Sequence, residues 1–216
     1  MFSKEELSAG FRLFEQPWSF LLSVADLNQL PPSGPVEIAL AGRSNVGKSS
    51  LFNALVRQMG LARTSNTPGR TQQLNYYAPA IGDLYLVDMP GYGFAQAPKN
   101  IVEDWTALVR SYLAGRQRLM CVLLLIDARH GIKSNDKEIM KLLNETAVSF
   151  QIVLTKTDKV TNENLSTIEK ETRVEVKNYT AGRTEILSTS SLNSLGIPEL
   201  RAAIAKTYQE NALIKS

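Results

Sequence analysis

Gly42-Arg43-Ser44-Asn45-Val46-Gly47-Lys48-Ser49 is the stretch that decides the fold, because it matches the pattern G-x-x-x-x-G-K-[ST]. The apolar run Val36–Ala41 precedes it, and a stretch of helical period, Lys48–Gln58, follows it. In this context the glycines let backbone N–H groups turn inward around phosphate oxygens, and the positive end of the helix faces them. The sequence therefore predicts a phosphate-binding loop in which Lys48 neutralises the β- and γ-phosphates and Ser49 offers its hydroxyl to Mg²⁺.

Beyond this loop the chain alternates short apolar runs with stretches of helical period, which is typical of a mostly parallel sheet covered by helices. Strands are expected at Val36–Ala41, Leu74–Pro79, Asp83–Asp88, Met120–Ala128, Phe150–Leu154 and Glu185–Ser188. Helices are expected at Lys48–Gln58, Ile101–Leu113, Asp136–Thr146, Asn162–Tyr179 and Ile197–Ala212. Because Ala80-Ile81-Gly82 is too short for a parallel crossover, one hairpin is antiparallel. We predict an α/β fold with a six-stranded, mostly parallel sheet, one antiparallel edge strand and helices on both faces.

Length and composition indicate one globular domain with an extension. The chain has 216 residues, of which 44% are hydrophobic and 21% are charged. Residues 1–34 end in Pro31-Pro32-Ser33-Gly34 and are expected to pack as an N-terminal extension on the domain formed by residues 35–216. No apolar run approaches the ~20 residues that span a bilayer, and no signal-peptide pattern is found. The single cysteine, Cys121, lies in a buried-strand pattern, which excludes a disulfide scaffold and favours a reducing cytoplasm.

The charge is unevenly placed along the chain. Positions 38–82 contain no acidic residue, and their basic residues are Arg43, Lys48, Arg57, Arg63 and Arg70. The net charge of +3 does not by itself argue for nucleic acid, but this stretch predicts an anionic partner. The phosphates of a bound nucleotide and an RNA surface explain it equally well.

A second motif, Asp88-Met89-Pro90-Gly91, has the pattern D-x-x-G at the end of the third expected strand. There a carboxylate reaches Mg²⁺ through a water, while the Gly91 N–H faces the γ-phosphate. Between the two motifs lies the polar stretch Thr64–Gln73, which is long enough to fold over a nucleotide. Thr71 is our choice for a second Mg²⁺ hydroxyl, with Thr67 as the alternative.

A third motif, Thr155-Lys156-Thr157-Asp158, follows the fifth expected strand and emerges at the same carboxyl edge of the sheet. Asp158 accepts hydrogen bonds from N1–H and the exocyclic amine of guanine, a donor pair that adenine lacks, while the stem of Lys156 covers one face of the purine. Thr155 lacks the amide of the more usual Asn, which would tie the base site to the phosphate loop. Ser190-Ser191-Leu192 offers a backbone N–H to guanine O6, although the run from position 188 to 191 allows other registers.

Together these residues resemble the EngB (YihA/YsxC) family of bacterial ribosome-assembly GTPases, which belongs to the translation-factor class of P-loop GTPases with a Ras-like domain. The resemblance runs from about Pro35 to Lys206. It is carried by the segments Glu37–Leu51, Thr67–Gln72, Asp88–Gly93, Asp127-Ala128-Arg129-His130-Gly131 and Thr155–Asp158. In that family Thr is usual at the position of Thr155.

The resemblance implies a switch that binds GTP and GDP with Mg²⁺, hydrolyses GTP and acts late in assembly of the large ribosomal subunit, with loss disturbing cell division and septation. It implies the large subunit or its precursor as partner, and we expect a monomer in the bacterial cytoplasm with no membrane contact. The expected nucleotide-binding residues are Gly42, Arg43, Ser44, Asn45, Val46, Gly47, Lys48, Ser49, Ser50, Gly69, Arg70, Thr71, Gln72, Asp88, Met89, Pro90, Gly91, Thr155, Lys156, Thr157, Asp158, Ser190, Ser191 and Leu192. Of these, Ser49, Thr71 and Asp88 are assigned to Mg²⁺, and Lys48, Thr71, Gly91 and Asn45 to catalysis.

Tyr92 occupies the position where many GTPases carry a Gln that orients the attacking water. A phenol cannot do the work of that carboxamide, so slow intrinsic turnover is predicted. Asn45 resembles the residue that coordinates K⁺ in potassium-stimulated GTPases, which leads to the hypothesis of K⁺ stimulation. The alternative for Asn45 is a residue chosen for turn geometry.

Aromatic residues follow the second motif. These aromatic residues are either partner contacts or the seam between this segment and the helix that follows, and Tyr92 and Phe94, flanked by glycines in an expected loop, are the candidates for exposure. The spacing of seven between Trp105 and Tyr112 favours the core for both. The only histidine, His130, lies in an expected loop and is not expected to act in catalysis.

Two other functions stay open at this point. One is a nucleotide-gated binding module or adaptor at the division machinery, in which hydrolysis is incidental. The other is an ATP-using kinase of the same phosphate-loop class, which the position of Asp158 after Lys156 and the lack of an evident lid disfavour.

Overall fold

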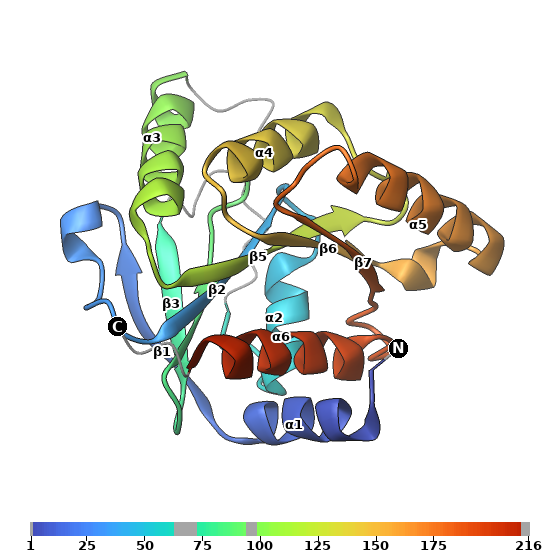
Figure 1. Ribbon diagram of the computed structural model, residues 1–216, viewed down its shortest axis with the longest axis horizontal. Coiled ribbons are helices and arrows are strands. Elements are labelled where there is room, and N and C mark those ends of the chain that lie inside the picture. The colour runs from blue at the N-terminus through green and yellow to red at the C-terminus, as the bar shows by residue number, and fades with distance from the viewer. Residues whose placement is uncertain (1, 63–72, 94–98, 213–216) are drawn as a thin grey trace.

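The chain forms one sheet with helices on both faces. The structure is a computed structural model and describes residues 2–62, 73–93 and 99–212, with the side chains of the last range given from residue 107 onward. Seven strands lie in the order β1-β3-β4-β2-β5-β6-β7 (Figure 1). They are β1 Trp18–Val24, β2 Val36–Gly42, β3 Leu74–Pro79, β4 Leu84–Asp88, β5 Leu119–Asp127, β6 Phe150–Thr155 and β7 Gly182–Ser188. β2 pairs in parallel with β4 and β5, and β6 and β7 continue the parallel series, which confirms the predicted fold class.

The prediction of six strands was one short, because the N-terminal segment supplies β1. β1 pairs antiparallel with β3, and β3 is antiparallel to β4 through the short hairpin predicted at positions 80–82. The antiparallel strand β3 therefore lies inside the sheet, and β1 forms its edge. The register shifts between Phe20 and Leu22, and Phe20 and Leu21 are both exposed, so the alternation that marks a strand in a sequence is broken here.

The helices are α1 Lys4–Glu15, α2 Lys48–Val56, α3 Lys99–Gly115, α4 Ser134–Glu145, α5 Asn162–Val176 and α6 Ile197–Ala212. Helices α3, α4 and α5 cover one face of the sheet, and α2 and α6 cover the other (Figure 1). Five of the six lie where they were predicted. The sixth, α1, begins with a capping box, in which Ser3 Oγ accepts from the Glu6 N–H and the Glu6 carboxylate accepts from the Ser3 N–H.

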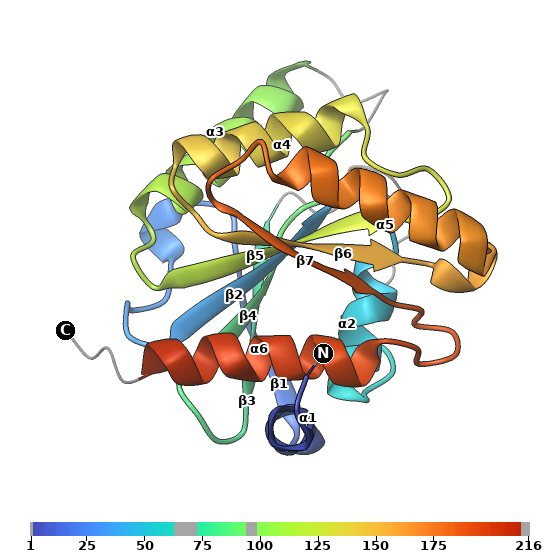
Figure 2. The same ribbon diagram turned by 45° about the vertical axis from the view of Figure 1, so that its right-hand side comes forward.

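Helix α1 packs across α6, and Figure 2 shows α1 end-on while α6 runs horizontally across the picture. Gly10 lies at the crossing, where an added Cβ would meet the backbone N of Ala202 at 2.5 Å, so only glycine permits this approach. Phe14 of α1 stacks on Trp18 of β1 with ring centroids 5.2 Å apart. Residues 1–34 thus contribute both a helix and a strand to the core.

Alternate residues of each central strand fill the two layers of the core. In β2, Ala39 and Ala41 join the apolar cluster beneath α3, α4 and α5, whereas Ile38 and Leu40 join the cluster beneath α2 and α6. Cys121 is buried in the second cluster, as the sequence predicts.

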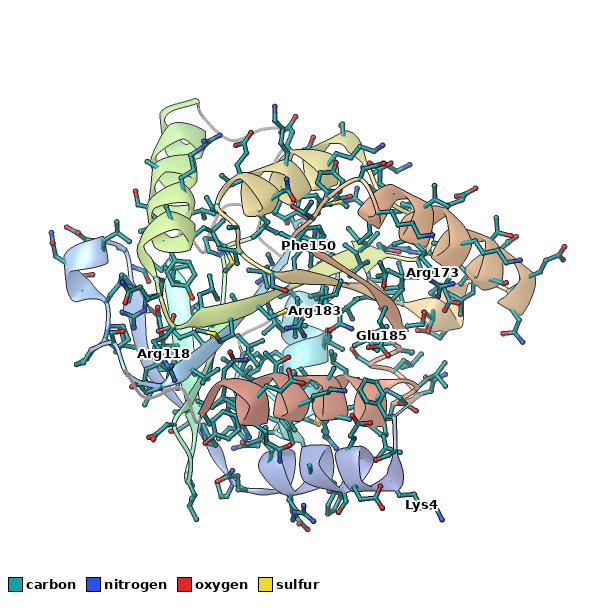
Figure 3. The ribbon with its side chains drawn as sticks, viewed as in Figure 1. Lys4, Arg118, Phe150, Arg173, Arg183 and Glu185 are labelled. Atoms are coloured by element: carbon teal, nitrogen blue, oxygen red, sulfur yellow. The ribbon has the colours of Figure 1, made fainter. Side chains whose placement is uncertain are left out.

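The outer parallel strands connect these layers to α5 and α6. Phe150 of β6 meets Tyr179 edge-on, with ring centroids 6.1 Å apart. Arg183 of β7 lies between the sheet and α6 (Figure 3), and it donates hydrogen bonds to Ser149 Oγ and Thr207 Oγ1. These contacts fix the β7 edge against α6.

Helix α6 also fixes the far end of α2, the helix that follows the phosphate loop. Arg201 is buried, and it donates from Nε to the carbonyl of Leu55 and from Nη2 to the carbonyl of Ala54, both at 2.9 Å. A cation at the carboxyl end of a helix satisfies carbonyls that lack partners within the helix. The position of α2, and with it the phosphate loop, therefore depends on α6.

A buried carboxylate lies at the start of β2, at the edge of the sheet opposite the phosphate loop. Glu37 is fully buried, and its Oε2 accepts from the hydroxyls of Tyr112 at 2.9 Å and Tyr76 at 3.3 Å. Its Oε1 accepts from Arg116 Nε at 2.7 Å, and Arg116 also donates to the carbonyl of Pro31. Both carboxylate oxygens are thus paired, as a buried charge requires. The burial of Tyr112 confirms its predicted place in the core.

Replacing Glu37 with Gln is expected to lower the free energy of unfolding by about 3 kcal/mol, because it leaves the guanidinium of Arg116 buried without a counter-charge. Urea unfolding measures the change. The control is Glu175→Gln, which breaks the exposed pair of Glu175 with Lys137 and is expected to cost less than about 1 kcal/mol. Equal effects of the two substitutions would contradict the role given to Glu37.

Stability is expected to fall above pH 10. Burial, and then the negative charge of Glu37, raise the pKa values of Tyr76 and Tyr112, and burial beside Asp136 raises that of Tyr92. The unfolded tyrosines ionise near pH 10, so from there the folded chain holds protons that the unfolded chain loses. Each buried tyrosine then costs up to about 1.4 kcal/mol per pH unit.

Urea unfolding at pH 8 and pH 11 measures this loss, and absorbance of tyrosinate reports ionisation. Only part of the seven tyrosines should ionise before the chain unfolds. Ionisation of all seven tyrosines near pH 10 in the folded protein would contradict the burial of Tyr76, Tyr92 and Tyr112.

Candidate functional site

The carboxyl ends of the five parallel strands bring the predicted motifs to one edge of the sheet. The phosphate loop follows β2, Asp88 ends β4, Asp127 ends β5, Thr155 ends β6 and Ser188 ends β7. Open α/β sheets bind ligands at this edge. The structure therefore places three motifs that are distant in sequence around a single site.

The phosphate loop has the backbone that its sequence predicts. Gly47 lies immediately before α2 with φ of 103°, a conformation that side chains disfavour, and Asn45 also has a positive φ of 61°. Lys48 and Ser49 form the first residues of α2, so the amino end of this helix faces the loop. This arrangement directs backbone N–H groups and the positive helix end toward one point, which suits a phosphate chain.

Lys48 and Asp88 meet across the site. Lys48 Nζ lies 2.5 Å from Asp88 Oδ1, and both side chains are largely buried. Ser49 lies beside Lys48 at the start of α2. A serine hydroxyl and a carboxylate form an all-oxygen donor set, which fits a hard ion such as Mg²⁺. Within the described ranges no cluster of three or more His, Cys, Asp or Glu residues could hold a metal ion.

The D-x-x-G segment runs directly beside the phosphate loop. The Met89 N–H donates to the Leu40 carbonyl, and the backbone of Tyr92 exchanges hydrogen bonds with the loop through Gly42 O and the Ser44 N–H. A Cβ added at Gly91 would meet Ser44 N at 3.3 Å. The D-x-x-G segment is therefore in direct contact with the phosphate loop.

Tyr92 is buried, so the prediction that it is exposed was wrong. Only 4% of its surface is accessible, and its hydroxyl donates to Asp136 Oδ1 at 2.8 Å. Asp136 is fully buried in the first turn of α4, accepts from the Lys133 N–H, and lies 3.4 Å from Arg43 Nε. The ring fills the core beneath α4, since the β-type pairing with the phosphate loop turns its side chain inward.

Thr155 ties the base site to the phosphate loop, contrary to the expectation that this connection would be missing. Its Oγ1 donates to the Val46 carbonyl at 2.7 Å, and the residue is buried. The hydroxyl of Thr155 thus makes the contact with the phosphate loop that was expected to need the amide of an Asn. Lys156 adds a second connection, because its Nζ donates to the Asn45 carbonyl at 2.6 Å.

Asp158 and Ser190 are brought together, as expected for a base site. Ser190 Oγ donates to Asp158 Oδ1 at 2.6 Å, and this hydrogen bond holds the pKa of Asp158 below its usual value. The Ser190 N–H donates to the Leu195 carbonyl, and the Leu192 N–H to Ser190 Oγ. Of the predicted trio, the N–H groups of Ser190 and Leu192 thus have partners, and none of the hydrogen bonds given for the described residues uses the Ser191 N–H.

Some of the other predicted site residues lie in the described ranges, and the rest lie outside them. Asn45 and Ser50 are exposed, Met89 and Pro90 are buried, and the Thr157 N–H donates to the Thr189 carbonyl. The residues that lie outside the described ranges are Thr67, Gly69, Arg70, Thr71, Gln72 and Phe94. The side chain of Trp105 is likewise outside what is described.

Two residues of the site received no role from the sequence. Asp127 ends β5 and pairs with both Lys156 and Arg129, and Asp136 holds Tyr92 and Arg43. For Asp127 the available signal was its place at the end of a buried strand that is followed by Arg129, His130 and Gly131. For Asp136 it was an acidic residue in the first turn of a helix, which by itself indicates only a cap.

Comparisons with known proteins agree with this geometry. Residues 37–156 match a family model described as 50S ribosome-binding GTPase, and residues 103–210 match one described as elongation factor Tu GTP binding domain. A relative from Rhizobium meliloti named probable GTP-binding protein EngB is 57% identical over 200 residues, which cover 89% of this chain and 92% of that protein. One of the same name from Bartonella tribocorum is 56% identical over 203 residues, which cover 90% and 95%.

A solved structure shows the same fold. A crystal structure of a probable GTP-binding protein engB superposes with a TM-score of 0.62 at 22% identity, covering 81% of this chain and all of that one. In the ranges that the structure describes, every helix is too short or too polar to cross a membrane.

Proposed function

The chain belongs to the EngB family of GTP-binding proteins, and from this premise we propose that it is a guanine-nucleotide switch acting in assembly of the large ribosomal subunit. It is a GTPase, and it binds GTP and GDP, generally with Mg²⁺, as GTPases of these families do. The observation that carries the ribosomal part is the match to a family described as 50S ribosome-binding GTPase. That match contains the whole acid-free stretch from position 38 to 82, which favours an anionic partner.

In the proposed site, the phosphate loop holds the phosphates and Lys48 neutralises the β- and γ-oxygens. Ser49, Asp88 and Thr71 would hold Mg²⁺, which would withdraw charge from the phosphates. Asp158 reads the guanine edge, the stem of Lys156 covers one face of the base, and the Ser191 N–H meets O6. The ion pair of Lys48 with Asp88 supports this assignment, since it brings the phosphate ligand and the metal ligand to one point.

We propose that hydrolysis is slow without a partner. The hydroxyl of Tyr92 is bonded to Asp136 and its ring lies in the core, so this side chain does not orient a water as a Gln does. The contact of Tyr92 with Asp136, and of Asp136 with Arg43, connects the D-x-x-G segment to the phosphate loop and to α4. A change in this segment on hydrolysis would alter the face formed by α4, which supports a nucleotide-gated partner surface.

Hydrolysis is expected to be faster in KCl than in NaCl. Asn45 is exposed at the phosphate loop with its backbone held by Lys156, so its side-chain oxygen is available to a monovalent cation beside the phosphates. Phosphate release measured at equal ionic strength in the two salts tests this. Asn45→Ala should remove the difference between the two salts. Equal wild-type rates in both salts would contradict the K⁺ hypothesis.

The experiment for the partner is sedimentation of the protein with 50S subunits and their precursors, with GDP or a non-hydrolysable GTP analogue, at two salt concentrations. Comigration only with the GTP analogue is the expected result. Lys48→Ala, in which binding of GTP should be weakened, is the matched control and should comigrate less than the wild type at the same concentration of the analogue. Absence of comigration in both states would contradict the ribosomal role and favour the adaptor at the division machinery.

We propose that the protein acts as a monomer in the bacterial cytoplasm, and that its loss disturbs division and septation through the shortage of large subunits. Depletion followed by ribosome profiles tests the order of events. Septation defects that precede any loss of 50S subunits would favour the adaptor.

A further inference from the structure

Asp127 lies between the phosphate loop and the segment Thr155–Asp158, which we call the base loop. The proposed function assigns no role to Asp127. It is the last residue of β5, and only 4% of its surface is accessible. Its Oδ2 lies 2.9 Å from Lys156 Nζ and 2.7 Å from Arg129 Nη2, and its Oδ1 accepts from the N–H and Nε of Arg129. Two cations therefore hold the carboxylate: Arg129, from the loop that follows β5, and Lys156, from the base loop.

Lys156 is fixed at both ends by these contacts. Its backbone has a positive φ of 56°, and its Nζ is shared between Asp127 Oδ2 and the Asn45 carbonyl. Between these points the stem passes the phosphate loop, since a Cβ added at Gly47 would lie 3.6 Å from Lys156 Cε. A lysine side chain is long and flexible, and only contacts at its tip can hold the stem as a flat surface.

We infer that Asp127 is a positioning residue of the nucleotide site, which holds the Lys156 ammonium so that the lysine stem forms one wall of the slot for the base. This inference rests on the proposed function, in which Lys156 covers a face of guanine. Asp127 acts on the face of the base and not on its edge. Its effect is therefore independent of the exocyclic groups of the purine, unlike the effect of Asp158.

The charge state of Asp127 suits this role. Burial by itself would raise the pKa of Asp127, but hydrogen bonds from Arg129 and Lys156 outweigh it and hold the pKa well below its usual range. The carboxylate is thus ionised across the neutral range, and the contact with Lys156 is a charged one. Charged hydrogen bonds of this kind contribute more than neutral ones.

The test is Asp127→Asn, with dissociation constants measured for GDP and for inosine diphosphate, which lacks the exocyclic amine. Both constants are expected to rise about 10- to 100-fold, the factor for one lost charged hydrogen bond, with their ratio unchanged. Asp158→Asn, in contrast, should change the ratio. Arg129→Gln is the matched control: it removes the other cation from Asp127 but keeps Lys156 in place, and should stay within about threefold of wild type.

A double-mutant cycle separates positioning from a general structural effect. Lys156→Met should weaken both diphosphates, and adding Asp127→Asn to it should have no further effect, because the group that Asp127 holds is gone. The double variant also removes both charges, so it serves if the single Asp127→Asn chain does not fold. Additive losses, or wild-type affinity in Asp127→Asn, would overturn the inference.

The same measurements show which proposal has failed. If Lys156→Met binds GDP as tightly as wild type, or if Asp158→Asn leaves the ratio of the two diphosphates unchanged, then the assignment of the base site is wrong. If both of those variants behave as expected and only Asp127→Asn is silent, then the proposed function stands and the role of Asp127 does not.

Discussion

Replacing Lys48 with Ala is expected to reduce GTP hydrolysis about a thousandfold and to weaken binding of GTP. Lys48 is the first residue of α2, its Nζ lies 2.5 Å from Asp88 Oδ1, and its side chain is mostly shielded from water. In the proposed site, a cation in this position would neutralise charge on the β- and γ-phosphates where water cannot do so. Loss of one such preorganised group typically costs a factor of about a hundred to a thousand, and more for a cation on a transferring phosphoryl group.

Phosphate release under single-turnover conditions measures this effect, and binding of a fluorescent GTP analogue measures affinity. The control is Lys137→Ala, which removes an exposed lysine of α4 that pairs with Glu175, and it should leave both quantities unchanged. Because removal of Lys48 also leaves Asp88 without its cation, the melting temperature of the nucleotide-free variant is needed. A folded Lys48→Ala chain that retains more than a tenth of the wild-type rate would contradict the assignment.

Replacing Asp158 with Asn is expected to lower the affinity for GDP about a thousandfold and to shift preference to xanthosine diphosphate. Two charged hydrogen bonds to guanine are lost, each worth about 1.5–3 kcal/mol, which together give a factor of about a hundred to ten thousand. An Asn side chain presents one acceptor and one donor, and these match the N1–H and the O2 of xanthine. Ser190 keeps a partner in the variant, since its hydroxyl can donate to the amide oxygen.

Competition binding with the two diphosphates measures this exchange. Ser190→Ala is the companion variant, because it removes the hydrogen bond that orients Asp158 but leaves the carboxylate. It should weaken GDP binding only about tenfold, with no gain for the xanthine nucleotide. Unchanged preference for GDP in a folded Asp158→Asn chain would show that the guanine edge is read elsewhere.

The low pKa of Asp158 bears on how affinity depends on pH. The hydrogen bond from Ser190 keeps the carboxylate ionised below its usual range. Loss of GDP affinity through protonation of Asp158 is therefore expected only below the usual range of a carboxyl group.

Much of the site was predictable because its signals are local. A phosphate loop needs a glycine with a positive φ immediately before a helix, and Gly47, which precedes Lys48, meets this requirement. The signal therefore lies within a few neighbouring residues. The parallel strands follow from runs of apolar residues, and their carboxyl ends meet at one edge in any sheet of this kind. The order of the motifs therefore predicts that Asp88, Thr155 and Asp158 lie at the same edge of the sheet.

The N-terminal segment was harder to interpret because its pattern is irregular. The shift of register at Leu21 exposes two consecutive apolar residues in β1, so the alternation of a strand is lost. Strand β1 is recognisable only through its partner β3. In α1 the capping box of Ser3 and Glu6 was a readable signal that indicated a helix start.

The sequence by itself determined the fold class, the phosphate loop and the order of the motifs. These features depend on backbone conformation and hydrophobic periodicity, which are set by residues close together in the sequence. Only the tertiary structure decided that Tyr92 is buried against Asp136, that Thr155 bonds to Val46 and that Asp127 holds Lys156. These contacts join residues from different loops, and their geometry depends on how the strands are paired and packed. A side chain turns inward or outward according to that packing, and no local pattern records it.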